Sequence, residues 1–383
     1  MASPNLVQQL EGLLPAVCGW REQIEHDRRL PAGLVTALRD TAVFALEVPA
    51  AIGGREADPV EILRAIETIS RADGSTGWCV GVGVANNGAA GLMQEAGARE
   101  VFSDPSAPVA GVFAPSGAAG RVDGGVRVSG RWQFASGVTH CDWVWAGCMV
   151  MEDGRPHLTS AGPEIIYAAI PVRSVDVHDT WFVSGLCGTA SHDISVADVF
   201  VPESRVFAFG SAPQQPGPLY RLPALGWFVS HLAAVSLGLA RGALDDLVSL
   251  AQTKTPAFST AVLADRPVAQ VEVARAEAAL GAARAFLFET VDDLWRTVVE
   301  GGEPTAQQLA KNRVAAVNAT DVGAVVTRTA SVLAGGSAIR QASALQRHTR
   351  DAEAIAHHFT VAPHVWEDAG RVFLGRKPTA PMF

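Results

Sequence analysis

Apolar residues in roughly the first 105 positions recur at helical spacing, with polar residues between them. The positions that show this best are Leu34, Leu38, Ile62, Ile66 and Ile69. Spacings of three and four place such residues on one helix face, so the pattern predicts amphipathic helices. A V-P-x-x-x-G-G break over residues 48–54 separates two of them. The D-G-S-T run at residues 73–76 offers N-cap side chains for another.

From about residue 106 to residue 215 the period changes to two, as in β-strands. The tight-turn signal at Asp123, Gly124 and Gly125 lies between two apolar runs and predicts a hairpin. Further strands are expected over residues 142–151, 165–172 and 192–201. Several strands without intervening helices predict a compact antiparallel sandwich or barrel.

The remaining residues are again helical and contain few helix breakers. Long helices are expected over residues 226–252, 268–300, 304–334 and 343–374. Four consecutive helices of this length predict an up-and-down bundle. The fold class is therefore α+β, in three domains: N-terminal helices (1–105), a central antiparallel β-domain (106–215) and a C-terminal four-helix bundle (216–383).

Composition narrows the function classes. The net charge of −9 and the absence of any basic run argue against nucleic acid as a partner. The N-terminal stretch lacks the basic and long apolar regions of a signal peptide, and no segment offers the ~20 uninterrupted apolar residues of a membrane span. Five cysteines without a CxxC pair predict reduced thiols in a cytoplasmic protein.

Several common catalytic motifs are missing. No GxGxxG follows a predicted strand, and GxxxxGK[ST], HExxH and GxSxG do not occur. A nicotinamide-binding Rossmann domain, a metalloprotease and an α/β-hydrolase are therefore poor candidates. Adjacent residues on a helix point about 100° apart, so His357 and His358 cannot both bind one metal ion. We expect no metal site.

The segment Gly-Arg-Trp-Gln-Phe-Ala-Ser-Gly, residues 130–137, is the most informative part of the chain. It reads as a strand with Trp132 and Phe134 on one face, because side chains alternate along a strand. The small residues Ala135, Ser136 and Gly137 that follow would let a backbone amide and a hydroxyl approach a flat ligand. An ordinary hairpin strand remains the alternative for this segment alone.

This segment resembles the flavin-binding strand of the acyl-CoA dehydrogenase superfamily. Its W-x-F-A-S-G…H-x-x-W form looks most like the flavin-dependent monooxygenase branch, the oxygenase halves of two-component hydroxylases. The V-P-x-x-x-G-G turn, the D-G-S-T-G-W segment and the closing region 334–358 extend the resemblance over the other domains. It implies N-terminal helices, a β-domain and a four-helix bundle, the same division that periodicity predicts.

The resemblance also implies functional residues. Ser136, or the Ala135–Ser136 backbone, would contact flavin N5, and His358, seven residues after Asp351, would be the catalytic base. The remaining cofactor-binding residues implied are Phe113, Ala114, Ser116, Trp132, Phe134, Gly335 and Gly336. Substrate-side candidates are Trp78, Asn86 and His231, although for His231 we favour a buried structural histidine. For Arg350 and Asp351 we favour an ion pair.

Acyl-CoA dehydrogenases use a glutamate base at one of two bundle positions, and this chain has neither. The first position aligns near Phe228, and no glutamate lies between Glu203 and Glu272; at the second, H-H-F-T stands where the family has Y-E-G-T. Two departures from the monooxygenase branch also matter. Asn86 replaces a substrate-facing histidine, and Cys187 replaces an arginine, which leaves room for reactions other than phenol hydroxylation.

The function that the resemblance implies is a monooxygenase component. It would use reduced flavin (FMNH2 or FADH2) and O2, through a C4a-hydroperoxide, to oxygenate a hydrophobic, aromatic or polycyclic small molecule. A separate NAD(P)H:flavin reductase would supply the flavin. Apolar positions on more than one face of residues 268–334 predict a homotetramer, with Gly335 and Gly336 near a neighbour's flavin. The alternatives are an acyl-CoA dehydrogenase-like desaturase or oxidase and a flavin-free scaffold.

Overall fold

The chain begins with a set of α-helices. In the computed structural model, which describes residues 5–160 and 162–379, these are α1 (Leu6–Asp27), α2 (Ala32–Asp40), α3 (Pro59–Ser70), α4 (Gly74–Asn87) and α5 (Glu95–Val101). The predicted N-cap of α4 is confirmed. Asp73 Oδ1 accepts hydrogen bonds from the backbone N–H of Thr76 at 2.7 Å and from its hydroxyl at 2.8 Å, which satisfies a donor that the helix itself leaves free.

The strands that follow form one eight-stranded sheet and a small two-stranded one. They are β1 (Val109–Val122), β2 (Gly125–Ala135), β3 (Trp143–Glu152), β4 (Arg155–Pro156), β5 (Leu158–Thr159), β6 (Gly162–Pro163), β7 (Ile165–Pro171), β8 (Asp176–His178), β9 (His192–Pro202) and β10 (Val206–Phe207). The order in the large sheet is β10-β7-β3-β1-β2-β9-β8, with β4 paired to β3. The predicted hairpin is confirmed: Val122 faces Gly125 across a two-residue turn in which Gly124 has a φ of +76°.

The α+β fold class is confirmed, but the sheet is not entirely antiparallel. β1 and β3 run parallel, with Val109 opposite Trp143. After β2 the chain passes through a short 3₁₀ helix (Val138–His140) and places β3 on the other side of β1. Alternating apolar residues and turn signals reveal strands but not their order, so the sequence pattern could not predict this pairing.

Three of the four predicted bundle helices are confirmed: α6 (Ala224–Ala251), α7 (Pro267–Val299) and α8 (Ala306–Ala334). The fourth, expected over residues 343–374, is wrong as one helix. It is divided into α9 (Ala344–Ala356) and α10 (His364–Phe373). Pro363 disfavours helical backbone at the residue before it, and Ala362 is accordingly extended, with φ −68° and ψ 160°. His358, also extended at φ −70° and ψ 136°, lies in this break.

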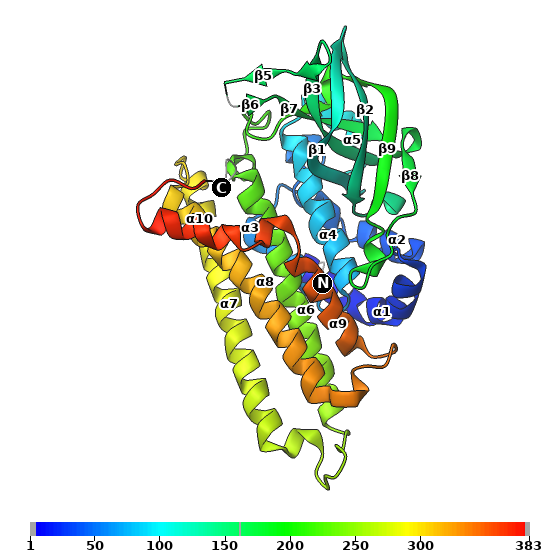
Figure 1. Cartoon of the computed structure of the whole chain (residues 1–383), viewed down its shortest axis with the longest axis vertical. Helices are drawn as coiled ribbons and strands as arrows, with labels where there is room; N and C mark the ends of the chain where they lie inside the picture. The colour runs from blue at the N-terminus through cyan, green and yellow to red at the C-terminus, as the bar shows by residue number, and fades with distance from the viewer. Residues whose placement is uncertain (1–4, 161, 380–383) are drawn as a thin grey trace.

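Helix α6 is the centre of the bundle. It packs against α3, α4 and α8, and it is long and apolar enough to span a membrane by length and composition, but 94% of that stretch is buried in the protein. It is a core helix. Helix α4 contacts both α6 and β1, and in Figure 1 it runs between the sheet and the long bundle helices. A cavity beside α4 therefore borders all three parts of the chain.

Candidate functional site

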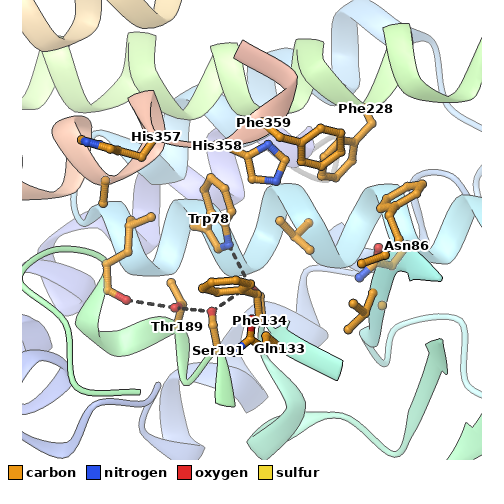
Figure 2. Close-up of a pocket in the computed structure, with 18 of the residues that line it drawn as sticks. Trp78, Asn86, Gln133, Phe134, Thr189, Ser191, Phe228, His357, His358 and Phe359 are labelled. Atoms are coloured by element: carbon orange, nitrogen blue, oxygen red, sulfur yellow. Dashed lines mark hydrogen bonds between the residues drawn. The ribbon is translucent and has the colours of Figure 1, made fainter. Parts of the chain in front are cut away.

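A cavity of about 440 Å³ lies where α4, the first part of β1, the end of β2, the turn before β9, α6 and the break after α9 meet. Most of the side chains around it are apolar or aromatic. The lining residues are Trp78, Val82, Asn86, Gly111, Val112, Phe113, Ala114, Gln133, Phe134, Ser136, Trp181, Leu186, Thr189, Ser191, Phe228, Ala354, His357, His358 and Phe359. Figure 2 shows Trp78, His358 and Phe228 on one side of this space and Phe134, Ser191 and Thr189 on the other. Its size and lining are typical of a small-molecule site.

The floor of the cavity is formed where β2 ends. Phe134 has a φ of +65°, and the pairing of β2 with β9 shifts register between Trp132 and Ala135. The shift turns the Phe134 ring outward, where it is 63% exposed and packs edge-on against Trp181 at 6.1 Å. A positive φ is uncommon for a residue with a bulky side chain and often marks a functional site.

Ser136, directly after this bulge, belongs to a chain of hydrogen bonds. Its Oγ accepts from Trp78 Nε1 at 3.1 Å and lies 2.7 Å from Ser191 Oγ. Ser191 Oγ lies 2.7 Å from Thr189 Oγ1, which donates to the carbonyl of Leu186 at 2.9 Å. The dashed lines in Figure 2 follow this chain from Trp78 to Thr189. Three side-chain hydroxyl groups from two segments are thus linked beside the cavity.

The turn that carries Thr189 is held by the middle of α9. Gly185 lies against the backbone of Arg350, where a Cβ would come within 2.1 Å of the carbonyl oxygen. The Leu186 N–H donates to Asp351 Oδ1 at 2.6 Å. The two sequence motifs G-L-C-G-T and R-D therefore meet in space. Arg350 forms the expected ion pair, with Glu25 at 2.7 Å. Asp351 is 1% exposed and accepts a hydrogen bond from a backbone amide instead. The ion-pair interpretation is therefore wrong for Asp351.

His358 projects into the cavity from the break after α9. Its ring lies 5.7 Å from that of Trp78 and 5.9 Å from that of Phe228. Nδ1 lies 2.8 Å from Thr360 Oγ1, and burial lowers the pKa of His358 to about 4. The imidazole is therefore neutral at physiological pH. His357 also borders the cavity, but it caps α9, is exposed and lies 2.7 Å through Nδ1 from the Glu353 carbonyl.

Asn86 and Phe113 close the far end of the cavity. Asn86 is 1% exposed, and its Nδ2 donates to the Val109 carbonyl at 3.0 Å. Because that carbonyl can only accept, the amide orientation is fixed and Oδ1 is left without a protein hydrogen bond among the described residues. The Phe113 ring packs against Phe228 at 5.2 Å. Phe113 and Ala114 lie where the pairing of β1 with β3 is interrupted, between Val112 and Gly117.

Several predicted residues do not line the cavity. Trp132 is fully buried in the β-domain and donates to the Gly147 carbonyl at 2.7 Å; Gly117 makes room for its ring, since a Cβ there would lie 2.1 Å from it. The expectation that Trp132 and Phe134 share a face is therefore wrong, because the bulge intervenes. Ala135 is also fully buried, paired with His192, and Ser116 is exposed on β1 outside the lining.

His231 and the glycine pair lie elsewhere too. His231 is 0% exposed, with Nε2 2.6 Å from Glu47 Oε1 and Nδ1 3.0 Å from the Trp227 carbonyl. Both ring nitrogens have protein partners in the helical core, as the favoured interpretation of His231 as a buried structural histidine requires. Gly335 and Gly336 begin the 3₁₀ helix at the end of α8 and do not belong to the lining.

Sequence reasoning missed Ser191 and Trp181. Ser191 follows the G-L-C-G-T turn by two residues, and only the pairing of β9 with β2 brings it to Ser136. Among the described residues, no group of three histidine, cysteine, aspartate or glutamate side chains is placed to hold a metal ion.

Comparison with known proteins agrees with this architecture. Residues 14–102 match the family model "Acyl-CoA dehydrogenase, N-terminal domain", and residues 230–363 match "Acyl-CoA dehydrogenase, C-terminal domain". The chain is 34% identical to an indole-3-acetate monooxygenase of Pseudomonas putida over 93% of its own length and 90% of that protein. It is 32% identical to the flavin-dependent monooxygenase oxygenase subunit HsaA of Rhodococcus jostii, covering 92% of this chain and 93% of HsaA.

A solved structure of XiaF from a Streptomyces species, in complex with FADH2 and glycerol, has the same fold. It superimposes with a TM-score of 0.91 at 27% identity and covers 98% of this chain and 96% of XiaF.

Proposed function

Because this chain belongs to the flavin-dependent monooxygenases of the acyl-CoA dehydrogenase superfamily, as an oxygenase component that uses reduced flavin and O2, we propose that it oxygenates an uncharged aromatic or polycyclic small molecule in the cavity between Ser136 and His358. The observation that carries the proposal is the hydroxyl chain at Ser136 facing an aromatic cavity that has a neutral histidine on its other side. A relative is named as the oxygenase subunit of a flavin-dependent monooxygenase, and this chain carries no nicotinamide-binding motif; both support a separate reductase as partner.

The residues around Ser136 fit a flavin ring. The Ser136 hydroxyl accepts a hydrogen bond from Trp78 and has a lone pair left for a ligand. Phe134 and Trp181 present aromatic surface beside it, and Ala114 has a small side chain that admits a flat ring. We assign Ser136 to N5 of the flavin, with Phe113, Ala114 and Phe134 along the ring. When bound, the reduced flavin would supply the two electrons that activate O2, one atom of which is transferred to the substrate while the other leaves as water.

The substrate belongs on the other side of the cavity. Trp78, Phe228 and Val82 provide apolar contact, and Asn86 Oδ1 offers a hydrogen-bond acceptor. His358 would remove a proton from the substrate through Nε2, which has no protein partner among the described residues. The Thr360 N–H donates to Nδ1 at 3.4 Å, which fits the tautomer with the proton on Nε2. Base action through Nε2 requires the other tautomer, in which Nδ1–H donates to Thr360 Oγ1. Thr360 contacts Nδ1 through both its N–H and its hydroxyl, so it orients the ring.

The lining favours an uncharged substrate. No lysine, arginine, aspartate or glutamate occurs among the described residues around the cavity. A carboxylate bound there would lose its water without gaining a cationic partner, which costs several kcal/mol. The same lack of a carboxylate base supports oxygenation over the acyl-CoA dehydrogenase type of proton abstraction, which remains the alternative.

We also propose a homotetramer in the cytoplasm. Large apolar side chains are exposed along α7, α8 and the segment after α8, among them Val271 (49%), Val325 (63%), Val332 (69%) and Ile339 (82%). Neighbouring copies would cover this surface. The five cysteines are all free thiols, which supports a reducing compartment.

The proposal is tested by incubating the purified protein with an unrelated NAD(P)H:flavin reductase, FMN or FAD, and a mixture of neutral aromatic compounds in air. We expect an oxygenated product by mass spectrometry that requires protein, reductase and flavin together. Flavin binding without any product from uncharged aromatics would contradict the substrate assignment, and reduction of bound flavin by an acyl thioester would support the alternative.

A further inference from the structure

The hydrogen bonds around Ser136 run in one direction. We infer that Ser191 and Thr189 are positioning residues that hold the Ser136 hydroxyl as a hydrogen-bond acceptor toward the cavity, and that they thereby contribute to the preference for reduced over oxidised flavin expected of an oxygenase component. This inference rests on the proposed function, since it concerns the flavin side of the same cavity. It assigns a role to two further residues, neither of which needs to contact the reacting atoms.

The direction follows from the groups at the two ends. Trp78 Nε1–H can only donate, and it donates to Ser136 Oγ. The Leu186 carbonyl can only accept, and Thr189 Oγ1 gives its one proton to it. Thr189 must then accept from Ser191, and Ser191 must accept from Ser136. In the reverse order Thr189 Oγ1 no longer donates to the Leu186 carbonyl, which keeps its bonds from Trp181 Nε1 and the Thr189 N–H, both at 3.1 Å. The reverse order therefore has one hydrogen bond fewer within the protein.

Ser136 therefore donates its proton to Ser191, and one of its lone pairs faces the cavity. The relay, by which we mean the hydroxyl chain Ser136–Ser191–Thr189, is held rigidly, because Ser191 is 3% exposed and Thr189 is fully buried. The Leu186 N–H is bonded to Asp351, and the Gly188 N–H donates to Ser75 Oγ at 3.0 Å. Because helices α9 and α4 both hold this turn, the hydroxyl groups cannot reorient freely.

The two redox states of flavin meet this lone pair differently. N5 of reduced flavin carries a proton and donates, whereas N5 of oxidised flavin has only a lone pair. When Ser136 is a hydrogen-bond acceptor, it bonds the N5–H of reduced flavin, but it forms no hydrogen bond with N5 of oxidised flavin. One hydrogen bond of ordinary strength corresponds to about a two- to tenfold difference in the dissociation constant. An oxygenase that receives reduced flavin from a reductase and releases oxidised flavin benefits from such a preference.

The test is the ratio of dissociation constants for oxidised and reduced flavin, measured anaerobically for the reduced form with FMN and with FAD. Ser191→Ala and Thr189→Val each release the Ser136 proton, so oxidised N5 gains a donor, and the ratio should fall about two- to tenfold. Thr189→Ser keeps the hydroxyl and should restore the wild-type ratio. A purely structural effect would weaken both states together and leave the ratio unchanged.

Two controls isolate the relay. In a Ser136→Ala background, Ser191→Ala should have no further effect on the ratio, because the double-mutant cycle removes the group through which it acts. Ser195→Ala, which lies on β9 just after Ser191 and is bonded to His178, should behave as wild type. Ratios unchanged in both Ser191→Ala and Thr189→Val would overturn the inference while the proposed function stands. Failure of the wild-type protein to bind flavin in either state would overturn the proposed function itself.

Discussion

The indole N–H of Trp78 donates to the hydroxyl of Ser136 at 3.1 Å, which ties the first turns of α4 to the end of β2. The bond crosses from the helical part of the chain to the β-domain at the place where the cavity opens. Trp78 also packs edge-on against His358 at 5.7 Å. One side chain thus contacts both residues to which we assign the chemistry, so the two halves of the site are positioned by a common element.

Removing the Ser136 hydroxyl should uncouple the reaction without abolishing flavin binding. Losing one hydrogen bond costs about 0.5–1.5 kcal/mol, which is small beside the apolar contacts of a flavin ring. We therefore expect Ser136→Ala to bind reduced flavin within about tenfold of wild type and to release more H2O2 per NADH consumed. Peroxide and product measured in the same reaction check this. Unchanged coupling would move the N5 contact elsewhere, for instance to the Ala135 backbone.

His358→Ala should lower product formation by a factor of about 10²–10⁴, the usual loss when a general base is removed. The flavin would still be oxidised by O2, so H2O2 should replace product. His357→Ala is the matched control, because His357 is exposed and points to the Glu353 carbonyl; it should retain near wild-type turnover. If His358→Ala retained wild-type turnover and His357→Ala were inactive, the base would be His357 and our assignment would be wrong.

Stability should respond to pH through Asp351. Burial, and secondarily the charge of Asp73, raise the pKa of Asp351 to about 7. The native state then binds a proton that the unfolded state has already released between about pH 4 and pH 7, so native stability falls as pH rises through that window. Asp351→Asn keeps the oxygen that accepts from Leu186 and removes the charge. The variant should gain stability relative to wild type up to about pH 7, by on the order of 4 kcal/mol, and the gain should level off above it.

Denaturant unfolding of both proteins from pH 4.5 to 8.5 measures this difference. Asp246→Asn is the control of opposite sign. Burial alone would raise the pKa of Asp246, but the hydrogen bond from His348 and the charge of Arg21 lower it on balance. That variant should therefore be less stable than wild type by an amount that stays constant across this range, because the contribution of a lowered carboxyl pKa is lost only below about pH 4. A pH-independent difference for Asp351→Asn would show that Asp351 is ionised in the native protein.

Neutral aromatic compounds should be better substrates than their carboxylates. Indole and indole-3-acetate make a matched pair, since they differ by one charged arm, and a close relative is named for the second. With no cationic side chain among the described residues around the cavity, we expect kcat/KM for indole to exceed that for indole-3-acetate by about tenfold or more. Equal values, or a preference for the acid, would contradict the uncharged-substrate assignment.

The sequence predicted the elements well where local signals act alone. Asp73 caps α4 and Gly124 turns the first hairpin, as their side chains and backbone freedom require. Periodicity could not show the break before Pro363, because apolar positions continue through residues 343–374 at helical spacing. His358 was placed on a helix for this reason, and it lies instead on extended backbone that projects it into the cavity.

Site residues were predicted where a motif names them and missed where only the fold brings them together. Ser136, Phe134 and Asn86 lie in recognisable segments, and all border the cavity. The prediction that Trp132 shares a face with Phe134 was wrong, because the bulge at Phe134 interrupts the alternation of side chains along the strand. Ser191 reaches Ser136 across 55 positions of the chain. His231 meets Glu47 across 184. No local pattern encodes contacts of that range.

The central claim is that this protein transfers one oxygen atom from O2 to an aromatic substrate with reduced flavin. The most direct measurement is product mass after reaction under ¹⁸O2 in ordinary water, with an unrelated reductase supplying the flavin, and the reverse labelling with H2¹⁸O under ordinary O2. We predict one atom of ¹⁸O per product molecule in the first reaction and none in the second. A product that carries oxygen from water, or a dehydrogenated product without added oxygen, would contradict the account.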